Sequence, residues 1–269
     1  MSTPPTVHAD AQALGAAAAA LVADRIEAAG PRPFLLGCPG GRSAASTYLA
    51  LAEEVRRRGL DLSRLVVVMM DDYLVPDGDG GLRREDPAAA HSCERFARLE
   101  IVAPLNAAAA RGQGVADENV WLPDPADPAA YDERIRAAGG IDLFLLASGA
   151  SDGHVAFNPP GSDAATTTRV VQLPDTTRRD NLATFPTFGG DLAAVPTHGV
   201  TVGIATIRDH SREVLMLVHG ADKRGAVRRL AGADRYDADW PATVFVDCAH
   251  PHLFVDEAAA ADVVASTTH

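Results

Sequence analysis

The chain has 269 residues and carries 24 Lys and Arg against 36 Asp and Glu, which gives a formal net charge of −12. With 47% apolar residues, a chain of this length can bury a sizeable core without disulfides or metal clips. Its acidity and its 5% aromatic content argue against a nucleic-acid surface and an anionic membrane partner, whereas a small anionic substrate needs only a few local donors and is not excluded.

Helices and strands alternate along the first half of the chain. The Ala-rich segment 11–29 has a helical pattern that is broken by Gly30-Pro31. Residues 65–70 (Leu-Val-Val-Val-Met-Met) form a continuous apolar run, which is typical of a strand buried on both faces of a parallel sheet. The other elements predicted in this half are a strand at 33–37, a helix at 43–58 and a helical segment at 91–110.

The second half repeats this alternation. Its predicted elements are a helix at 127–138, strands at 141–146, 199–206 and 213–219, a helix from 223 to 230 and a last strand near 253–255. Strands that alternate with helices imply a parallel sheet that is covered on both faces. We therefore expect an α/β protein with a mostly parallel central sheet, organised as one domain over residues 1–269.

The cysteines and the N-terminus bear on the compartment. Cys38, Cys93 and Cys248 form no spaced pair, so we expect reduced thiols in a cytoplasmic protein. No basic segment precedes the N-terminal Ala run, which favours a helix over a signal peptide. No apolar run approaches the roughly 20 residues that a membrane span requires.

Residues suited to chemistry follow four of the predicted strands. In open α/β sheets, ligands bind beyond the carboxyl ends of the strands, so side chains at these positions meet at one edge. This convergence predicts a single catalytic pocket. The four segments are Pro39–Ser43, Asp71-Asp72, Asp152–His154 and His219–Lys223.

The segment Gly40-Gly41-Arg42-Ser43 lies between a strand and a helix. Glycines let the backbone approach an anion, and the N–H groups at the start of a helix favour negative charge. Ser43 is equally suited to cap that helix without binding anything. The segment matches neither a Walker A nor a GxGxxG pattern, so both interpretations stay open.

The acids Asp71 and Asp72 close the apolar run at 65–70. Burial and a like-charged neighbour raise the pKa of a carboxyl group, which makes such a residue usable as a general base. An acid at this position can also cap the next helix. Because adjacent residues of a strand point to opposite sides, we expect only one of the two to face a substrate.

The segment Asp152-Gly153-His154 combines a carboxylate, a turn residue and an imidazole. Gly153 permits a tight turn, and Asp152 can fix the tautomer of His154 or stabilise its cationic form. No second histidine lies at metal-ligand spacing, so we predict no metal site here. Lys223, Arg178 and Arg179 either lie at the surface or complete a phosphate clamp through charge-assisted hydrogen bonds.

Together these segments resemble the glucosamine-6-phosphate deaminase/isomerase and 6-phosphogluconolactonase superfamily over roughly residues 10–260. Residues 36–43 resemble the phosphate loop of the deaminases, and Met70-Asp71-Asp72-Tyr73 resembles their Met-Asp-Glu-Tyr. The segment 152–158, Asp-Gly-His-Val-Ala-Phe-Asn, is the most specific match and favours the deaminase branch, because the lactonases tend to have Thr-Ala-Ser after the histidine. The resemblance implies a three-layer, Rossmann-like fold.

The resemblance also implies roles for individual residues. Asp71 would move a proton between C2 and C1 of an opened sugar phosphate, and His154, oriented by Asp152, would assist ring opening. No cofactor or metal is expected, and the expected partner is a small phosphorylated sugar, with no nucleic acid and no membrane; the sequence is compatible with a homo-oligomer. The substrate- and phosphate-binding residues implied are Gly40, Gly41, Arg42, Ser43, Asp72, Gly153, Arg178 and Lys223.

Three departures from the deaminase pattern stand in this chain. Pro159 replaces the Glu that usually follows Phe-Asn and partners the catalytic histidine. Ala183 stands near the position of a phosphate-binding Arg, for which Arg178 or Arg42 is a candidate substitute. The approach to Asp152, Gly-x-Gly-x in the deaminases, has become Ser-Gly-Ala-Ser at residues 148–151.

The leading hypothesis is a sugar-phosphate aldose–ketose isomerase, most similar to a glucosamine-6-phosphate deaminase that releases ammonia and a ketose phosphate. The first alternative is a 6-phosphogluconolactonase in which His154 activates water on a lactone. The second is a sugar-phosphate sensor without turnover, which the loss of the acid at Pro159 would favour.

Overall fold

The computed structural model describes residues 3–264, and its centre is a seven-stranded sheet with the order β1-β11-β10-β7-β2-β3-β6. Every pair of neighbouring strands in this sheet is parallel, which confirms the mostly parallel central sheet predicted from the sequence. Its strands are β1 (Thr6–His8), β2 (Phe34–Cys38), β3 (Leu65–Met69), β6 (Val120–Trp121), β7 (Leu143–Ala147), β10 (Val214–Val218) and β11 (Pro251–Asp256).

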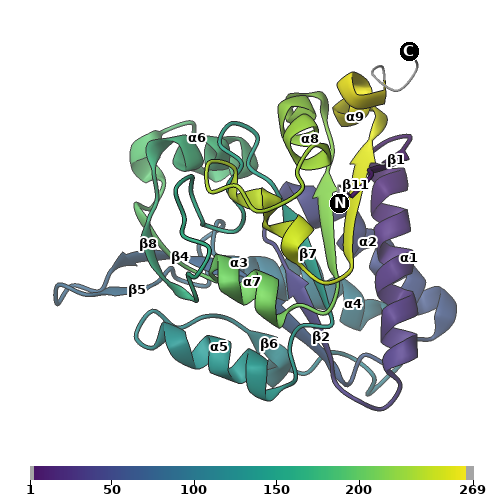
Figure 1. The fold of residues 1–269 in the computed structure, drawn as a ribbon. Helices are drawn as coiled ribbons and strands as arrows, with labels where there is room; N and C mark the ends of the chain where they lie inside the picture. The colour runs from purple at the N-terminus through teal and green to yellow at the C-terminus, as the bar shows by residue number, and fades with distance from the viewer. Residues whose placement is uncertain (1–2, 265–269) are drawn as a thin grey trace.

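Helices cover both faces of this sheet and complete the three layers (Figure 1). The helices are α1 (Ala11–Ala29), α2 (Ala45–Arg58), α3 (Cys93–Phe96), α4 (Ala103–Ala108), α5 (Pro128–Ala137), α6 (Asp175–Thr184), α7 (Ile204–His210), α8 (Arg224–Ala231) and α9 (Glu257–Val264). The bounds of α1 are those predicted, and a π-helical segment, Ala97–Val102, joins α3 to α4 within the predicted helical segment 91–110.

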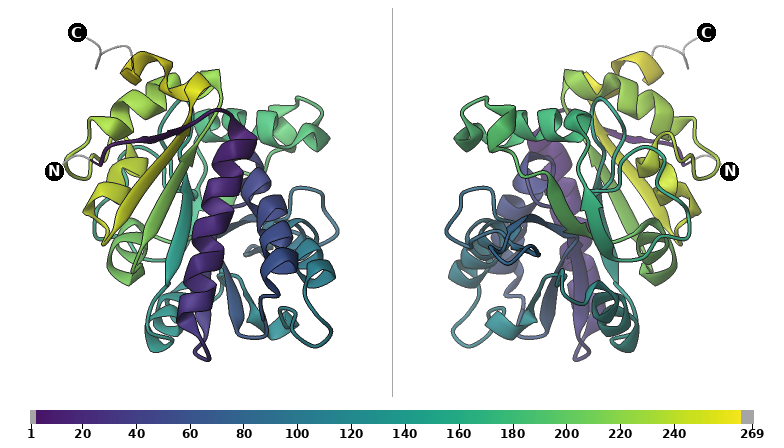
Figure 2. Two further views of the ribbon diagram at one scale, coloured as in Figure 1. Left: turned by 90° about the vertical axis from the view of Figure 1, so that its right-hand side faces the viewer. Right: turned by 90° about the vertical axis from the view of Figure 1, so that its left-hand side faces the viewer.

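Two apolar clusters pack against the central sheet, one on each of its faces, and a third, smaller one contains Tyr73 of β4 (Asp71–Pro76). On β3, Val67 packs into the cluster under α1 and α2, whereas its neighbours Val66 and Val68 pack into the other. This alternation is why a strand in the middle of the sheet is apolar at every position. Figure 2 shows α1 and α2 side by side on the first face.

A second, antiparallel sheet with the order β5-β4-β9-β8 was not predicted from the sequence. The chain enters it directly from β3: the N–H of Met70 still bonds to Cys38, while its carbonyl accepts the N–H of Val202. Asp71 and Asp72 therefore begin a new strand instead of closing the run at 65–70. The strands are β4 (Asp71–Pro76), β5 (Leu82–Arg84), β8 (Arg169–Gln172) and β9 (His198–Thr201).

One other expectation differs from the structure. The strand predicted at 199–206 ends at Thr201, because the Thr206 hydroxyl accepts the N–H of Gly203 and α7 begins. The polar segment that starts at Asp175 is the helix α6. Within residues 3–264, every helix is too short or too polar to cross a membrane. The three cysteines are buried and free, as expected.

Candidate active site

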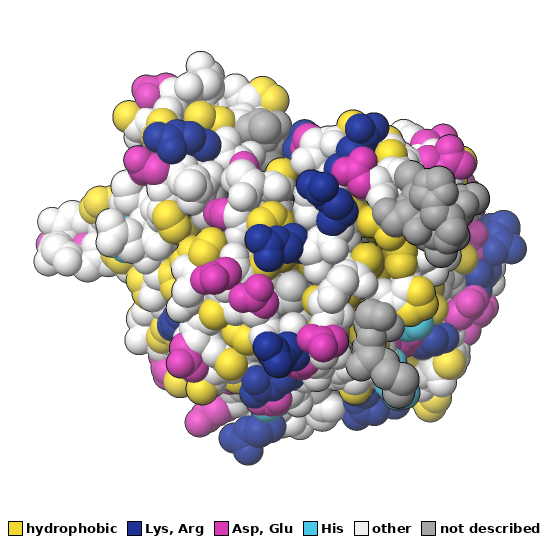
Figure 3. All heavy atoms as spheres, turned by 45° about the horizontal axis from the view of Figure 1, so that its top comes forward, with side chains coloured by type: hydrophobic (Ala, Val, Ile, Leu, Met, Phe, Trp, Pro, Cys, Tyr) yellow, Lys and Arg dark blue, Asp and Glu magenta, His cyan; other side chains and the backbone are white. Residues whose placement is uncertain are grey.

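A cavity of about 350 Å³ lies beyond the carboxyl ends of β2, β7 and β10. Its volume is within the range of small-molecule sites. All four segments predicted at strand ends contribute to its wall, through Gly40–Ser43, Asp71, His154 and Lys223. Figure 3 looks onto this edge of the molecule and shows basic and acidic side chains interspersed.

Asp71 occupies the first position of β4, where the chain passes from one sheet to the other. Its side chain is buried, and the Sγ of Cys93 lies 3.4 Å from Oδ1. Burial raises the pKa of Asp71 to about 7, and the charge of Asp72 adds to the rise, while the Cys93 thiol and His154 act against it. A carboxyl group with a pKa near neutrality can exchange a proton with a substrate carbon.

Asp72 lies outside the cavity, in contrast to the substrate-binding role expected for it. Its Oδ1 accepts the N–H groups of Tyr73 at 2.9 Å and of Cys93 at 3.0 Å. Only Asp71 of the two acids faces the cavity, as the alternation of a strand requires. Asp72 thus holds the backbone of Cys93, and the thiol of Cys93 contacts Asp71.

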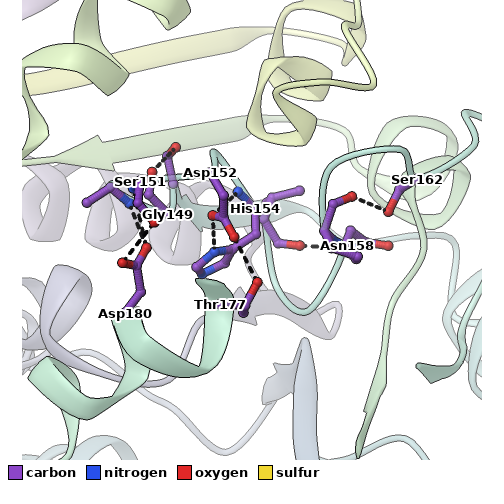
Figure 4. A network of polar contacts seen from close by, with 12 residues as sticks. Gly149, Ser151, Asp152, His154, Asn158, Ser162, Thr177 and Asp180 are labelled. Atoms are coloured by element: carbon purple, nitrogen blue, oxygen red, sulfur yellow. Dashed lines mark hydrogen bonds and ion pairs between the residues drawn. The ribbon is translucent and has the colours of Figure 1, made fainter. Parts of the chain in front are cut away.

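His154 is oriented by Asp152, which lies behind it (Figure 4). The Nδ1 of His154 lies 2.6 Å from Oδ1 of Asp152, whose Oδ2 accepts the Thr177 hydroxyl at 2.8 Å. Burial acts to raise the pKa of Asp152, but its hydrogen bonds with His154 and Thr177 hold that pKa well below the usual value. With an ionised acceptor at Nδ1, the other ring nitrogen, Nε2, is the atom available for proton exchange.

Two glycines shape the segment around His154. A Cβ on Gly149 would lie 2.3 Å from Nδ1 of His154, so only a glycine permits the observed approach. Gly153 has a φ of +66°, and a Cβ there would lie 2.2 Å from the Trp240 ring. Gly153 therefore builds the turn and lies outside the cavity wall, in contrast to the substrate contact expected of it.

Lys223 and the Gly40–Ser43 loop form the basic part of the cavity. Lys223 is buried and donates from Nζ to the Ser148 carbonyl at 2.5 Å. Burial lowers the pKa of Lys223, and the nearby carboxylate of Asp180 opposes that change. Ser43 does not cap α2, whose start lacks a side-chain cap, and it lines the cavity instead.

Arg42 and Arg178, the two candidate substitutes for a phosphate-binding arginine, lie in different places. Arg42 lines the cavity and pairs with Asp222 at 3.0 Å. Arg178 lies outside it, because its guanidinium donates to the carbonyls of Leu192 and Val195 at 2.6 and 2.9 Å. Ala183 belongs to α6, but its side chain is outside the described part of the chain.

Helix α6 contributes Thr177 and Asp180, which the sequence did not reveal. Arg179, Asp180 and Asn181 line the cavity, and Thr177 binds Asp152 from the same helix. The segment has no apolar stripe, so its helical phase could not be predicted.

One oxygen or nitrogen atom from each of Asp152, His154 and Asp180 lies within 4.8 Å of the others. Both carboxylates already accept hydrogen bonds from the protein.

The chain matches known proteins over nearly its whole length. Residues 9–254 match the family model for glucosamine-6-phosphate isomerases and 6-phosphogluconolactonase. Proteins named glucosamine-6-phosphate deaminase from Beutenbergia cavernae and from Arthrobacter sp. FB24 are 39% and 36% identical, over 90% and 91% of this chain and 87% and 88% of theirs.

Solved structures agree with this match. A monomeric glucosamine-6-phosphate deaminase superimposes with a TM-score of 0.78 at 25% identity, over 96% of this chain and 99% of the other. The 6-phosphogluconolactonase from Trypanosoma cruzi has a TM-score of 0.68 at 18% identity, over 98% of each chain. The second likeness is one of fold.

The contact between Gly149 and His154 gives a first prediction. Gly149→Ala forces the imidazole away from its position, so the low-field proton resonance of the Nδ1–H hydrogen bond to Asp152 should shift or disappear in NMR spectra. Gly225→Ala is the matched control, because its added Cβ meets nothing within 4 Å. An unchanged resonance in Gly149→Ala would contradict the assigned geometry.

The burial of Asp71 predicts a pH-dependent stability. The pKa of Asp71 is about 7 in the folded protein and near 3.8 in the unfolded chain. The contribution of the neutral carboxyl group to the free energy of unfolding is therefore fully present below pH 3.8 and is lost as the pH rises through 7. Asp71→Asn should therefore stabilise the protein at pH 8 by up to ~4 kcal/mol, with the gain vanishing towards pH 4. Urea unfolding at both pH values measures this.

Asp234→Asn, a substitution at an exposed position, is the control for that comparison. Equal destabilisation by Asp71→Asn at both pH values would show that burial does not oppose the ionisation of the Asp71 carboxyl group.

Proposed function

The chain belongs to the family of glucosamine-6-phosphate isomerases and 6-phosphogluconolactonases, and we propose on that basis that it deaminates glucosamine 6-phosphate to a ketose phosphate and ammonia. The observation that carries this proposal is the buried carboxyl group of Asp71, with a pKa of about 7, in the same cavity as the imidazole of His154. The deaminases among its relatives, at 33–39% identity, support the choice of this branch.

The reaction divides between the two groups. His154 accepts the proton of the anomeric hydroxyl through Nε2 while the C1–O5 bond breaks, and it returns a proton to O5 as the C1 aldehyde forms. Asp71 then removes the proton from C2, and the electron pair forms a C1–C2 double bond while O1 takes up a proton that the C2 ammonium group of the substrate releases. Return of the C2 proton from Asp71 to C1 leaves an iminium group at C2, which water hydrolyses to the ketone and ammonia.

The basic part of the cavity would hold the phosphate group. Lys223 supplies a cation and the Gly40–Ser43 loop supplies backbone N–H groups, while Arg42 can exchange Asp222 for the phosphate. The Arg42–Asp222 pair is half exposed, and such a pair contributes little stability, so the exchange costs little. Asp152 and the walls around Asp71 keep the imidazole and the base fixed before the sugar binds.

The central prediction is that the protein releases ammonia from glucosamine 6-phosphate. Asp71→Asn should lower kcat by at least ~100-fold, because the amide cannot accept the C2 proton, while circular dichroism stays unchanged. Hydrolysis of 6-phosphogluconolactone without ammonia release would favour the lactonase alternative. Thermal stabilisation by sugar phosphates without any product would favour the sensor.

The pH profile tests the base assignment. Asp71 must be ionised to act, so kcat/KM should fall about tenfold per pH unit below its pKa of about 7. Cys93→Ala removes a hydrogen bond that lowers the pKa of Asp71, so the acidic limb should move to higher pH. Cys248→Ala, a buried thiol that contacts carbonyls far from the cavity, should leave the profile in place. An acidic limb that does not move in Cys93→Ala would refute the assignment of that limb to Asp71.

A further inference from the structure

The side chain of Asp180 approaches His154 from α6 and lines the cavity. One of its oxygens, a ring nitrogen of His154 and an oxygen of Asp152 lie within 4.8 Å of one another. Figure 4 shows both carboxylates near the imidazole of His154, with Asp152 above the ring and Asp180 beside it. His154 therefore has two carboxylates as neighbours, of which the sequence indicated only Asp152.

Asp180 is held in this position by the loop that precedes Asp152. Its Oδ2 accepts the N–H of Ala150 at 3.2 Å, and its Oδ1 accepts the Ser151 hydroxyl at 3.0 Å. Thr177, three residues earlier in α6, binds Asp152 from the same face of the helix. One turn of α6 thus supports both carboxylates of the His154 site.

The surroundings of His154 create a need for this second carboxylate. The cavity also contains Lys223, Arg42 and Arg179, whose positive charges disfavour a further cation. Pro159 stands where the family resemblance places an acid beside the histidine, and a proline side chain can neither accept a proton nor carry a charge. Asp152 alone would have to stabilise the imidazolium that forms when His154 takes up a proton.

We propose that Asp180 is a positioning residue for His154, supplying from α6 the second carboxylate that stabilises the imidazolium during ring opening. The inference rests on the proposed function for the step in which it acts. There, the O1–H proton passes to Nε2 as the C1–O5 bond breaks, and His154 passes a proton to O5. Asp180 exchanges no proton with the sugar; it holds the ring and offsets its transient charge.

The kinetic test uses Asp180→Asn with two matched variants. Asp180→Asn should lower kcat on the cyclic substrate on the order of 10- to 100-fold with KM changed little, because the lost charge acts on the ring-opening step. Asp180→Glu should recover part of that loss. Asp175→Asn removes a carboxylate from the same helix that lies outside the cavity and pairs with Arg178 at 2.8 Å, so its kcat should stay within about twofold of the wild type.

A second arm separates ring opening from binding. The reduced open-chain analogue 2-amino-2-deoxyglucitol 6-phosphate has no ring to open, so wild type and Asp180→Asn should bind it equally. A loss of kcat in Asp175→Asn as large as that in Asp180→Asn would show that α6 as a whole, and not the Asp180 carboxylate, sets the rate. An effect of Asp180→Asn on KM alone would assign it to Lys223 and the phosphate end instead.

A third arm does not depend on turnover. In protein labelled with ¹⁵N-histidine, the ring nitrogen shifts of His154 at neutral pH should change in Asp180→Asn and stay unchanged in Asp175→Asn. Unchanged shifts in Asp180→Asn overturn the inference whether or not ammonia is released. If the wild type releases no ammonia but the shifts change as stated, the proposed function fails while the pairing of Asp180 with His154 holds.

Discussion

The site depends on the burial of one carboxyl group where two sheets meet. Met70 is hydrogen-bonded to both sheets, so the chain has no freedom to turn Asp71 towards solvent. Holding a carboxyl group in a dry position raises its pKa and costs on the order of 4 kcal/mol once it ionises. That cost is the source of its basicity, because a solvated aspartate would be too weak a base for a carbon acid.

The same junction explains why the neighbouring acid has a different task. Asp72 faces the other side of β4 and accepts two backbone N–H groups, one of them from the first residue of α3. This fixes Cys93, whose thiol then contacts Asp71 and moderates its pKa. The adjacent acids thus differ in role because their side chains point to opposite sides of the strand. Asp72 holds the backbone of Cys93, and the thiol of Cys93 lowers the pKa of Asp71.

The sequence predicted the parts of the fold whose hydrophobic pattern is unambiguous. The apolar run of β3 and the length of α1 were predicted because central strands and long helices bury regular surfaces. The second sheet was missed since β8 is four residues long and only partly buried, and β4 opens on two acids. Arg178 was expected at the phosphate, but it faces residues 192–195 while Arg179 faces the cavity. Because α6 has no apolar stripe, the sequence does not indicate which of its side chains face which way.

Helix α6 and the loop at residues 148–151 connect the departures from the family pattern. Ala150, at one of the two altered positions of this loop, donates its N–H to Asp180, the Ser151 hydroxyl donates to the same carboxylate, and a Cβ on Gly149 would collide with His154. Exchanging the acid at Pro159 for one on α6 therefore also requires a loop able to bind the new carboxylate. If Asp180 acts as proposed, the altered loop and the proline belong to one arrangement around the same imidazole, and Pro159 is then no sign of lost activity.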